Sequence, residues 1–145
     1  MATTSIYLNF DRVTEEAFLF YKHVFGTEFA GEIARMKDVP PQEGVPLLAE
    51  ADKNLVMHVA LPILGGTLLM GTDATGSMGF TVHQGNNVYI SLHPDSRDEA
   101  DRLFTTLSEG GVIEMPIQDM FWGDYFGSFV DKYGVRWMVN YSTKK

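Results

Sequence analysis

The two halves of the sequence carry the same order of elements, and this repeat restricts the fold more than any other feature. IYLNF at 6–10 corresponds to VYISL at 88–92, and GGTLLM at 65–70 corresponds to YGVRWM at 133–138. Each half carries an amphipathic helical stretch between these segments. Two diverged copies indicate a duplicated module, because a solenoid needs three or more stacked repeats. We expect each module to bury its helix against one sheet face and to turn the other face toward a shared cleft.

The first half is predicted to contain a strand, a helix and three further strands. The spacing of apolar residues across 17–25 predicts the helix, with Thr14 as the expected N-cap and Gly26 as the expected C-cap. The pair Gly65-Gly66 is typical of a hairpin turn. Alternating apolar residues predict strands at 5–10, 27–36, 55–63 and 67–70, with a proline-rich loop at 37–46.

The second half repeats this order. Ser96 and Glu99 have the spacing of a capping box, an apolar stripe follows, and Gly110-Gly111 ends the predicted helix. The sequence therefore predicts an α+β fold of two tandem β-α-β-β-β modules, whose curled mixed sheets surround a cleft. We expect a single domain over 1–145, in which module 1 (5–73) and module 2 (87–142) are joined by a linker at 74–86. The strands expected in the second module are 87–93, 112–115, 126–131 and 135–141.

The composition argues against several classes of protein. The 145 residues include no cysteine, which excludes disulfides, thiolate metal sites and a cysteine nucleophile. A net charge of −8 argues against a nucleic-acid partner, whose phosphates would be repelled. No apolar run approaches the roughly 20 residues that span a bilayer, and the first residues lack the pattern of a secretory signal. We therefore expect a cytoplasmic protein with no nucleic-acid or membrane partner.

The stretch MPIQDMFWGDYFGSFVDKYGVRWMVN at 115–140 is rich in aromatic residues and punctuated by glycines. Together with NFDRVTEEAFLFYKHVFGTEF and DSRDEADRLFTTLSEGG, it resembles the PhnB-like branch of the vicinal oxygen chelate superfamily. This superfamily includes glyoxalases, bleomycin-resistance proteins and extradiol dioxygenases, and the resemblance covers essentially the whole chain. It implies the paired modules described above, a ligand cleft between the sheets, and a homodimer.

The resemblance also implies where a metal would be held. Enzymes of the superfamily bind a divalent ion through the first and last strand of each module, which here puts the ligands at Met70, at Met138, and at or near Tyr7 and Tyr89. A thioether is a soft ligand, and a phenol with a pKa of about 10 binds these ions poorly at neutral pH. We therefore predict no metal and no other cofactor. The chain also has no glycine-rich segment suited to S-adenosylmethionine, so methyl transfer is not predicted.

Strand alternation separates a uniformly apolar face from a mixed face. The apolar face suits the helix stripes, which leaves the mixed face for a small, partly apolar or aromatic ligand. The residues expected beneath the helices are Ile6, Leu8, Phe10, Leu69, Val88, Ile90, Leu92 and Trp137. The residues expected to bind the ligand are Tyr7, Asn9, His58, Met70, Tyr89, Ser91, Met138 and Asn140, with Trp122 as a lid.

Several polar candidates also have a structural interpretation. A lone histidine such as His58 is more often a hydrogen-bonded core residue than a ligand or a base. Asn140 either orients a ligand carbonyl or satisfies a buried backbone group, and Trp122 is either a lid or a core plug. Asp73 is interpreted as a turn residue, and the remaining histidines are interpreted as surface residues: His23, His83 and His93.

Three hypotheses for function follow. The first is a PhnB-like protein of the vicinal oxygen chelate superfamily that binds a small, partly apolar or aromatic molecule. The second is a metal-dependent lyase, isomerase or dioxygenase with unusual ligands such as His58, Tyr7 and Asn140. The third is a dimeric, non-catalytic interaction protein. Metal analysis separates the second hypothesis from the first, and a native mass with and without ligand separates the third.

Overall fold

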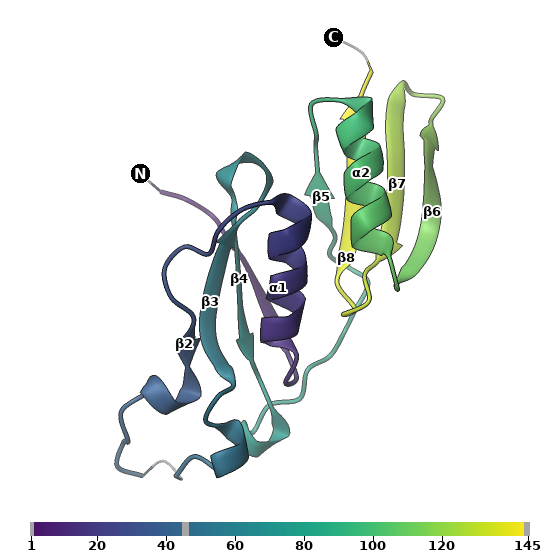
Figure 1. The fold of residues 1–145 in the computed structure, drawn as a ribbon. Helices are drawn as coiled ribbons and strands as arrows, with labels where there is room; N and C mark the ends of the chain where they lie inside the picture. The colour runs from purple at the N-terminus through teal and green to yellow at the C-terminus, as the bar shows by residue number, and fades with distance from the viewer. Residues whose placement is uncertain (1, 45–46, 144–145) are drawn as a thin grey trace. The chain divides into compact units, whose positions relative to one another are not determined.

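The protein is described by a computed structural model that covers residues 2–44 and 47–143, and the chain divides into two compact units, Met1–Val82 and His83–Lys145. Each unit contains a helix and a mixed sheet (Figure 1). The α+β fold and the β-α-β-β-β order of each module are confirmed. The first unit contains β1 (Ile6–Phe10), α1 (Thr14–Phe25), β2 (Ala34–Arg35), β3 (Val56–Pro62) and β4 (Leu68–Asp73). The second contains β5 (Ile90–Leu92), α2 (Arg97–Ser108), β6 (Val112–Asp119), β7 (Asp124–Val130) and β8 (Arg136–Ser142).

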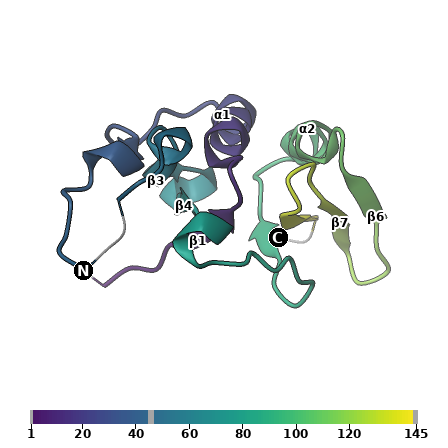
Figure 2. The same cartoon turned by 90° about the horizontal axis from the view of Figure 1, so that it is seen from below.

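The sheet of the first unit has the strand order β1-β4-β3-β2. The first strand, β1, runs parallel to β4, and the other neighbours are antiparallel. Figure 2 shows α1 on one side of this sheet. Phe18 and Tyr21 of α1 are fully buried and pack edge to face, with ring centroids 5.6 Å apart. They form the core with Leu61 of β3 and Leu69 of β4, which are also fully buried.

The second sheet repeats this arrangement, with the order β5-β8-β7-β6 and a parallel pairing of β5 with β8. The helix α2 lies on one side of it (Figure 2). Leu103 and Phe104 of α2 are buried, and the Phe104 ring meets Phe129 of β7 edge to face at 5.2 Å. Trp137 of β8 is fully buried, and its indole Nε1–H donates to Asp131 at 2.9 Å. A buried indole needs such an acceptor, because its N–H is removed from water.

The helix ends agree with the sequence except at Thr14. Gly26 caps α1 in the left-handed region at φ 65°, and Ser96 Oγ accepts from the backbone of Glu99, so both predicted caps are confirmed. Thr14 is the first residue of the helix rather than its N-cap, and its hydroxyl donates to Asp73. The Glu99 carboxylate accepts from Arg102. Of the two hydrogen bonds of a capping box, the one that Ser96 accepts is therefore the one that forms.

The strands predicted at 27–36 and 87–93 form only over Ala34–Arg35 and Ile90–Leu92. The second predicted strand, 27–36, pairs only over Ala34–Arg35, because Gly31 turns the backbone at φ 88° and the register shifts between the two paired residues. Val88 is not beneath α2 but 73% exposed, because the pairing of β5 with β8 begins only at Ile90. The alternation is confirmed elsewhere in β1, where Tyr7 is 50% exposed and Phe10 is buried.

The register of β5 against β8 is shifted by two residues from the one that the alignment of the repeats predicts. Tyr7 lies opposite Met70, whereas the residue opposite Met138 is Ser91 rather than Tyr89. Alternate residues of an extended segment point to the same side, so a shift of two keeps both candidates on one face. The position in the second module that corresponds to Tyr7 is therefore Ser91.

Candidate functional site

The first sheet carries a mixed face opposite the one that α1 covers. In the parallel pairing, Tyr7 lies beside Met70 and Asn9 lies beside Thr72. These four residues are exposed or half-buried, while their neighbours Leu69 and Gly71 are buried under the helix. The Ser5 hydroxyl lies 3.9 Å from the Met70 sulfur. We call this surface the first open face; its members are Tyr7, Asn9, His58, Met70 and Thr72.

Tyr7 and His58 form a polar pair on the first open face. The Tyr7 Oη lies 3.4 Å from His58 Nδ1, and the two ring centroids are 5.9 Å apart. The structure thus brings together two predicted site residues that are 51 positions apart in the chain. A phenol beside an imidazole can donate or accept a hydrogen bond, with roles set by the histidine tautomer. This pair can orient a ligand carbonyl or hydroxyl that lies over Met70.

The second sheet carries a corresponding mixed face on β5, β7 and β8. Ser91, Met138 and Ser128 lie in one row across the strands, and Phe126 lies opposite Asn140 in a neighbouring row. Met138 and Asn140 are half-buried, while Trp137 and Val139 between them are buried toward α2. We call this surface the second open face; its members are Tyr89, Ser91, Phe126, Ser128, Arg136, Met138 and Asn140.

His93 is exposed, as its sequence position predicts, and it also lies at the edge of the second open face. Its Nε2 lies 3.2 Å from the Ser91 hydroxyl, two residues earlier in the chain. The alternation of Tyr89, Ser91 and His93 contains the signal for this, because residues i and i+2 of an extended segment share a face. The imidazole therefore adds a second donor or acceptor to the edge of this face.

Glu114 adds to the second open face a residue that sequence reasoning missed, as it missed Phe126 and Ser128. It accepts a hydrogen bond of 2.8 Å from Tyr89 Oη and one of 2.6 Å from Arg136 Nη1. Arg136 also donates through Nε to the Gly85 carbonyl at 2.8 Å. The register of β6 against β7 shifts between Ile113 and Met115, and an irregularity of this kind changes which side chains face which side of a sheet. Pro116, which lies within the second register shift of β6, is a sequence signal for an irregular strand.

Trp122 lies in the turn between β6 and β7 and is 46% exposed. Its ring is 6.4 Å from that of Phe126, the residue opposite Asn140. Its other neighbour is Phe121, which is almost fully exposed and meets it edge to face at 5.0 Å. The indole therefore lies at the margin of the second open face and is not a core plug. Its action as a lid stays a prediction.

Asp73 is a structural residue. Its carboxylate is buried at the end of β4 and accepts hydrogen bonds from the Thr14 amide, the Thr14 hydroxyl and the Val56 amide. A carboxylate occupied by three buried donors holds together the elements that supply them. The strand end, the start of α1 and the start of β3 are thereby joined.

Ion pairs with shifted pKa values tie each helix to its own sheet. The pKa of Glu15 on α1 is lowered by its hydrogen bonds from Arg35 on β2, which are 2.7 and 2.8 Å long. In the second unit, the pKa of Asp119 on β6 is lowered by its hydrogen bonds from Arg97 on α2. Both pairs join a helix to an edge strand. The lowered pKa values of these two carboxyls therefore come from ion pairs that stabilise the fold.

The donors at the superfamily's metal positions are two thioethers, a phenol and a hydroxyl: Met70, Met138, Tyr7 and Ser91. Divalent Zn, Mn and Mg prefer imidazole or carboxylate ligands over these groups. Among residues 2–44 and 47–143, no three His, Asp or Glu side chains converge into a group that could hold a metal ion. The donor set does not fit the superfamily's divalent ion.

The fold defines the class to which the protein belongs. Two β-α-β-β-β units with a parallel pairing of first and last strands are the architecture of the vicinal oxygen chelate superfamily. The glyoxylase/bleomycin resistance protein/dioxygenase domain from Frankia sp. EAN1pec aligns with a TM-score of 0.66 over 99% of this chain and 94% of that chain. At 11% sequence identity, this likeness concerns the fold alone.

The family follows from the sequence comparison. The family described as 3-demethylubiquinone-9 3-methyltransferase matches residues 2–140. The chain belongs to this family, the PhnB-like branch of the superfamily. Protein YjdN of Escherichia coli K12 is 30% identical over 146 residues, covering 94% of this chain and 92% of YjdN.

Two solved structures also resemble the chain over nearly its whole length. Protein PA1353 of Pseudomonas aeruginosa is 33% identical with a TM-score of 0.79, covering 98% of both chains. The PhnB protein of Bacillus cereus is 26% identical with a TM-score of 0.73, covering 97% of this chain and all of that one. None of the helices in the described residues has the length and apolar character needed to cross a membrane.

Proposed function

We propose that the protein binds a small, partly apolar or aromatic molecule on its open faces. The observation that carries this proposal is the register of the second sheet, which aligns Ser91 with Met138 and Phe126 with Asn140 on the face opposite α2. Methionine offers an adaptable apolar contact, and an aromatic ring offers a stacking surface. Asn140 and the bonded pair of Glu114 and Arg136 supply polar groups that orient a ligand.

The first open face supports the same class of ligand. Met70 provides an apolar contact, and Tyr7 with His58 provides a donor and an acceptor at the margin. Each face therefore combines a thioether, an aromatic ring and neutral polar atoms. Such a lining favours a largely apolar molecule with a few polar atoms over a highly charged one, because a charge buried there would lack a full set of partners.

Methyl transfer, the activity in the family's description, is not part of the proposal. The connections from strand to helix, Asp11–Val13 and His93–Ser96, contain no glycine. Dinucleotide and related cofactors are held in open α/β sheets by glycine-rich turns at this point, where the helix N-terminus meets the phosphate or ribose. The two sheets are instead mixed, with antiparallel neighbours in each.

The test is a thermal-shift screen of neutral aromatic compounds, followed by titration of the compound with the largest shift. We expect Trp122→Ala and Asn140→Ala to raise its Kd about tenfold, equivalent to about 1.4 kcal/mol. The matched controls are Phe80→Ala and Asn87→Ala, which alter an exposed aromatic residue and an exposed asparagine outside both open faces. If no compound stabilises the protein, or if all four variants bind equally well, the proposal is wrong.

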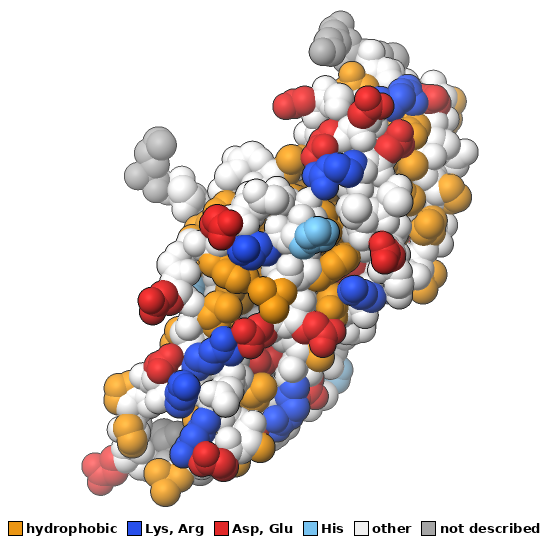
Figure 3. Space-filling view, in the orientation of Figure 1, with side chains coloured by type: hydrophobic (Ala, Val, Ile, Leu, Met, Phe, Trp, Pro, Cys, Tyr) orange, Lys and Arg blue, Asp and Glu red, His pale blue; other side chains and the backbone are white. Residues whose placement is uncertain are grey.

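We further propose that the protein forms a homodimer. The outermost strand of the second sheet, β6, exposes Val112, Ile113 and Met115, which are 66, 50 and 41% accessible. Figure 3 shows hydrophobic side chains along the side of the molecule where Figure 1 has β6. An edge strand with exposed apolar side chains favours pairing with another chain. A second copy of the protein is the partner that the family resemblance implies.

A further inference from the structure

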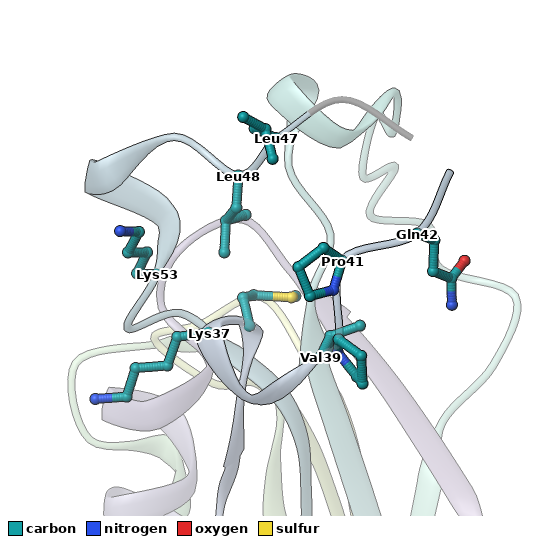
Figure 4. Close-up of a pocket in the computed structure, with 9 residues that line it drawn as sticks. Lys37, Val39, Pro41, Gln42, Leu47, Leu48 and Lys53 are labelled. Carbon is teal, nitrogen blue, oxygen red and sulfur yellow. The ribbon is translucent and has the colours of Figure 1, made fainter. Parts of the chain in front are cut away.

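A pocket separate from both open faces lies beside β2 in the first unit. Its volume is about 690 Å³, within the range of roughly 300–1,000 Å³ that small-molecule sites occupy. The described residues that line it come from two segments, 36–42 and 47–53 (Figure 4). None of them belongs to the first open face. The pocket is therefore a second candidate site with its own chemistry.

The body of the pocket is apolar. Its lining includes Met36, Val39, Pro41, Leu47 and Leu48. Val39 and Leu47 are 41 and 89% exposed, so the pocket presents apolar surface to water. Figure 4 shows Val39, Pro41, Leu47 and Leu48 between the lysines and Gln42. Covering such surface with a hydrocarbon chain is favourable because it removes apolar area from water.

One end of the pocket is cationic. The Lys37 amide donates to the Lys53 carbonyl at 3.0 Å, which fixes the two lysines next to each other. Their side chains lie on the same side of the pocket in Figure 4. Within the described residues, Lys53 pairs with Glu50 at 2.7 Å, whereas Lys37 has no carboxylate partner of this kind. Both lysines line the pocket, so an anion bound there would meet two cationic side chains.

The cationic end is anchored to the rest of the unit. Arg35, two residues before Lys37, binds Glu15 of α1 through both terminal nitrogens and donates to the Asn54 carbonyl at 2.9 Å. The Arg35 amide donates to Asp38 at 2.9 Å. These bonds hold the backbone on both sides of the lysine pair in place before a ligand arrives. A fixed backbone loses less entropy on binding than a mobile one.

We propose that this pocket binds an amphipathic anion, with an apolar chain or ring against Met36, Val39 and Leu48 and a carboxylate at Lys37 and Lys53. A medium-chain fatty acid has this chemistry. The proposal uses none of the residues of the open faces. Failure of either proposal therefore leaves the other unaffected.

The test compares decanoate, decanol and decyltrimethylammonium by isothermal titration calorimetry. We expect decanoate to bind at one site per chain and about tenfold more tightly than decanol, with the cationic analogue weakest. Lys37→Gln should remove most of the advantage of decanoate and leave decanol unchanged. Lys22→Gln is the matched control, because Lys22 lies on α1 outside the pocket and loses the same charge. Leu48→Asp should weaken both compounds.

Amide chemical shifts locate the bound decanoate. We expect the largest changes in 36–42 and 47–53. Changes centred on Tyr7 and His58, equal affinity for decanoate and decanol, or equal effects of Lys37→Gln and Lys22→Gln would each overturn the proposal. If Leu48→Asp lowers the melting temperature, the lysine variants and the shift map still decide the result.

Discussion

Thr14 is bound to Asp73 by two hydrogen bonds, one from its backbone amide at 3.2 Å and one from its hydroxyl at 2.7 Å. Both residues are buried, and the other oxygen of Asp73 accepts from the Val56 amide at 2.8 Å. The first turn of α1 is therefore capped by a side chain from the last strand of its unit. A capping acceptor supplied from a distant strand couples the helix to the sheet, because neither is satisfied without the other.

Asp73→Ala should destabilise the first unit by about 3 kcal/mol or more. The truncation leaves the two amides and the Thr14 hydroxyl buried without an acceptor, and each such group costs roughly 1–3 kcal/mol. Urea unfolding measures the change, with the exposed Asp95→Ala as the control. A loss smaller than that of Thr14→Val, which removes one of the three bonds, would contradict the argument.

Gly71→Ala should also destabilise the protein, by about 1–3 kcal/mol, because the added Cβ would overpack the contact between α1 and the sheet. A Cβ at residue 71 would lie 2.6 Å from Cε1 of Phe18 and 3.3 Å from the Leu8 carbonyl. The Phe18 ring is fully buried, so it cannot turn out into solvent without opening the core. Gly76→Ala is the control, because a Cβ at that residue meets nothing within 4 Å. Equal unfolding midpoints for the two variants would show that α1 does not lie so close to the sheet.

Local sequence patterns predicted the elements that depend on local chemistry. The two helices, their glycine and serine caps, and the alternation in β1 follow from residues close together in the chain. Thr14 is not the N-cap that the sequence predicts, because its hydroxyl donates to Asp73, 59 residues away. Local sequence patterns do not encode this contact.

The features that were missed depend on pairing between distant segments. Ser91 replaces Tyr89 opposite Met138 because the hydrogen bonds between β5 and β8 set the register. Glu114 joins the second open face where the register of β6 shifts, and that shift is set by the pairing of β6 with β7. Alternate residues of a strand point to the same face of the sheet, and a register shift of two residues preserves this. The predicted face of each site residue is therefore unaffected by the shift.

Asp52 should make stability depend on pH in the acid range. The pKa of this carboxyl is lowered by the hydrogen bond from Ser77 and by Arg12, whose nitrogen lies 2.8 Å away. A folded-state pKa below the unfolded value, about 3.9, gives stability that is fully present above that value. It is lost as the pH falls through the lowered pKa.

The comparison of wild type with Asp52→Asn measures this effect. We expect the difference in unfolding free energy to be constant between about pH 5 and 7 and to shrink below about pH 4. Asp95→Asn, at an exposed aspartate, is the control. A difference that grows as the pH falls would have the opposite sign and would rule out the bonded carboxylate as its source.

Protein purified without a chelator should contain well below one divalent ion per chain by plasma mass spectrometry. The reason is the donor set, since Met70, Met138 and Ser91 offer no carboxylate or imidazole to offset the dehydration of the ion. The double variant Met70→Glu/Met138→Glu should gain affinity for Zn or Mn. Stoichiometric metal in the wild type that is lost in His58→Ala would instead support the metal-dependent alternative.

The protein should have a mass near twice 16.2 kDa in light scattering at micromolar concentration. We expect Ile113→Lys to shift the mass toward the monomer, because it places a charge among the exposed apolar side chains of β6 beside Val112. Gln118→Lys is the matched control, since it adds the same charge to an exposed position of the same strand without removing an apolar side chain. A wild-type monomer at this concentration would disprove the dimer. Dimers that persist equally in both variants would place the interface away from this part of β6.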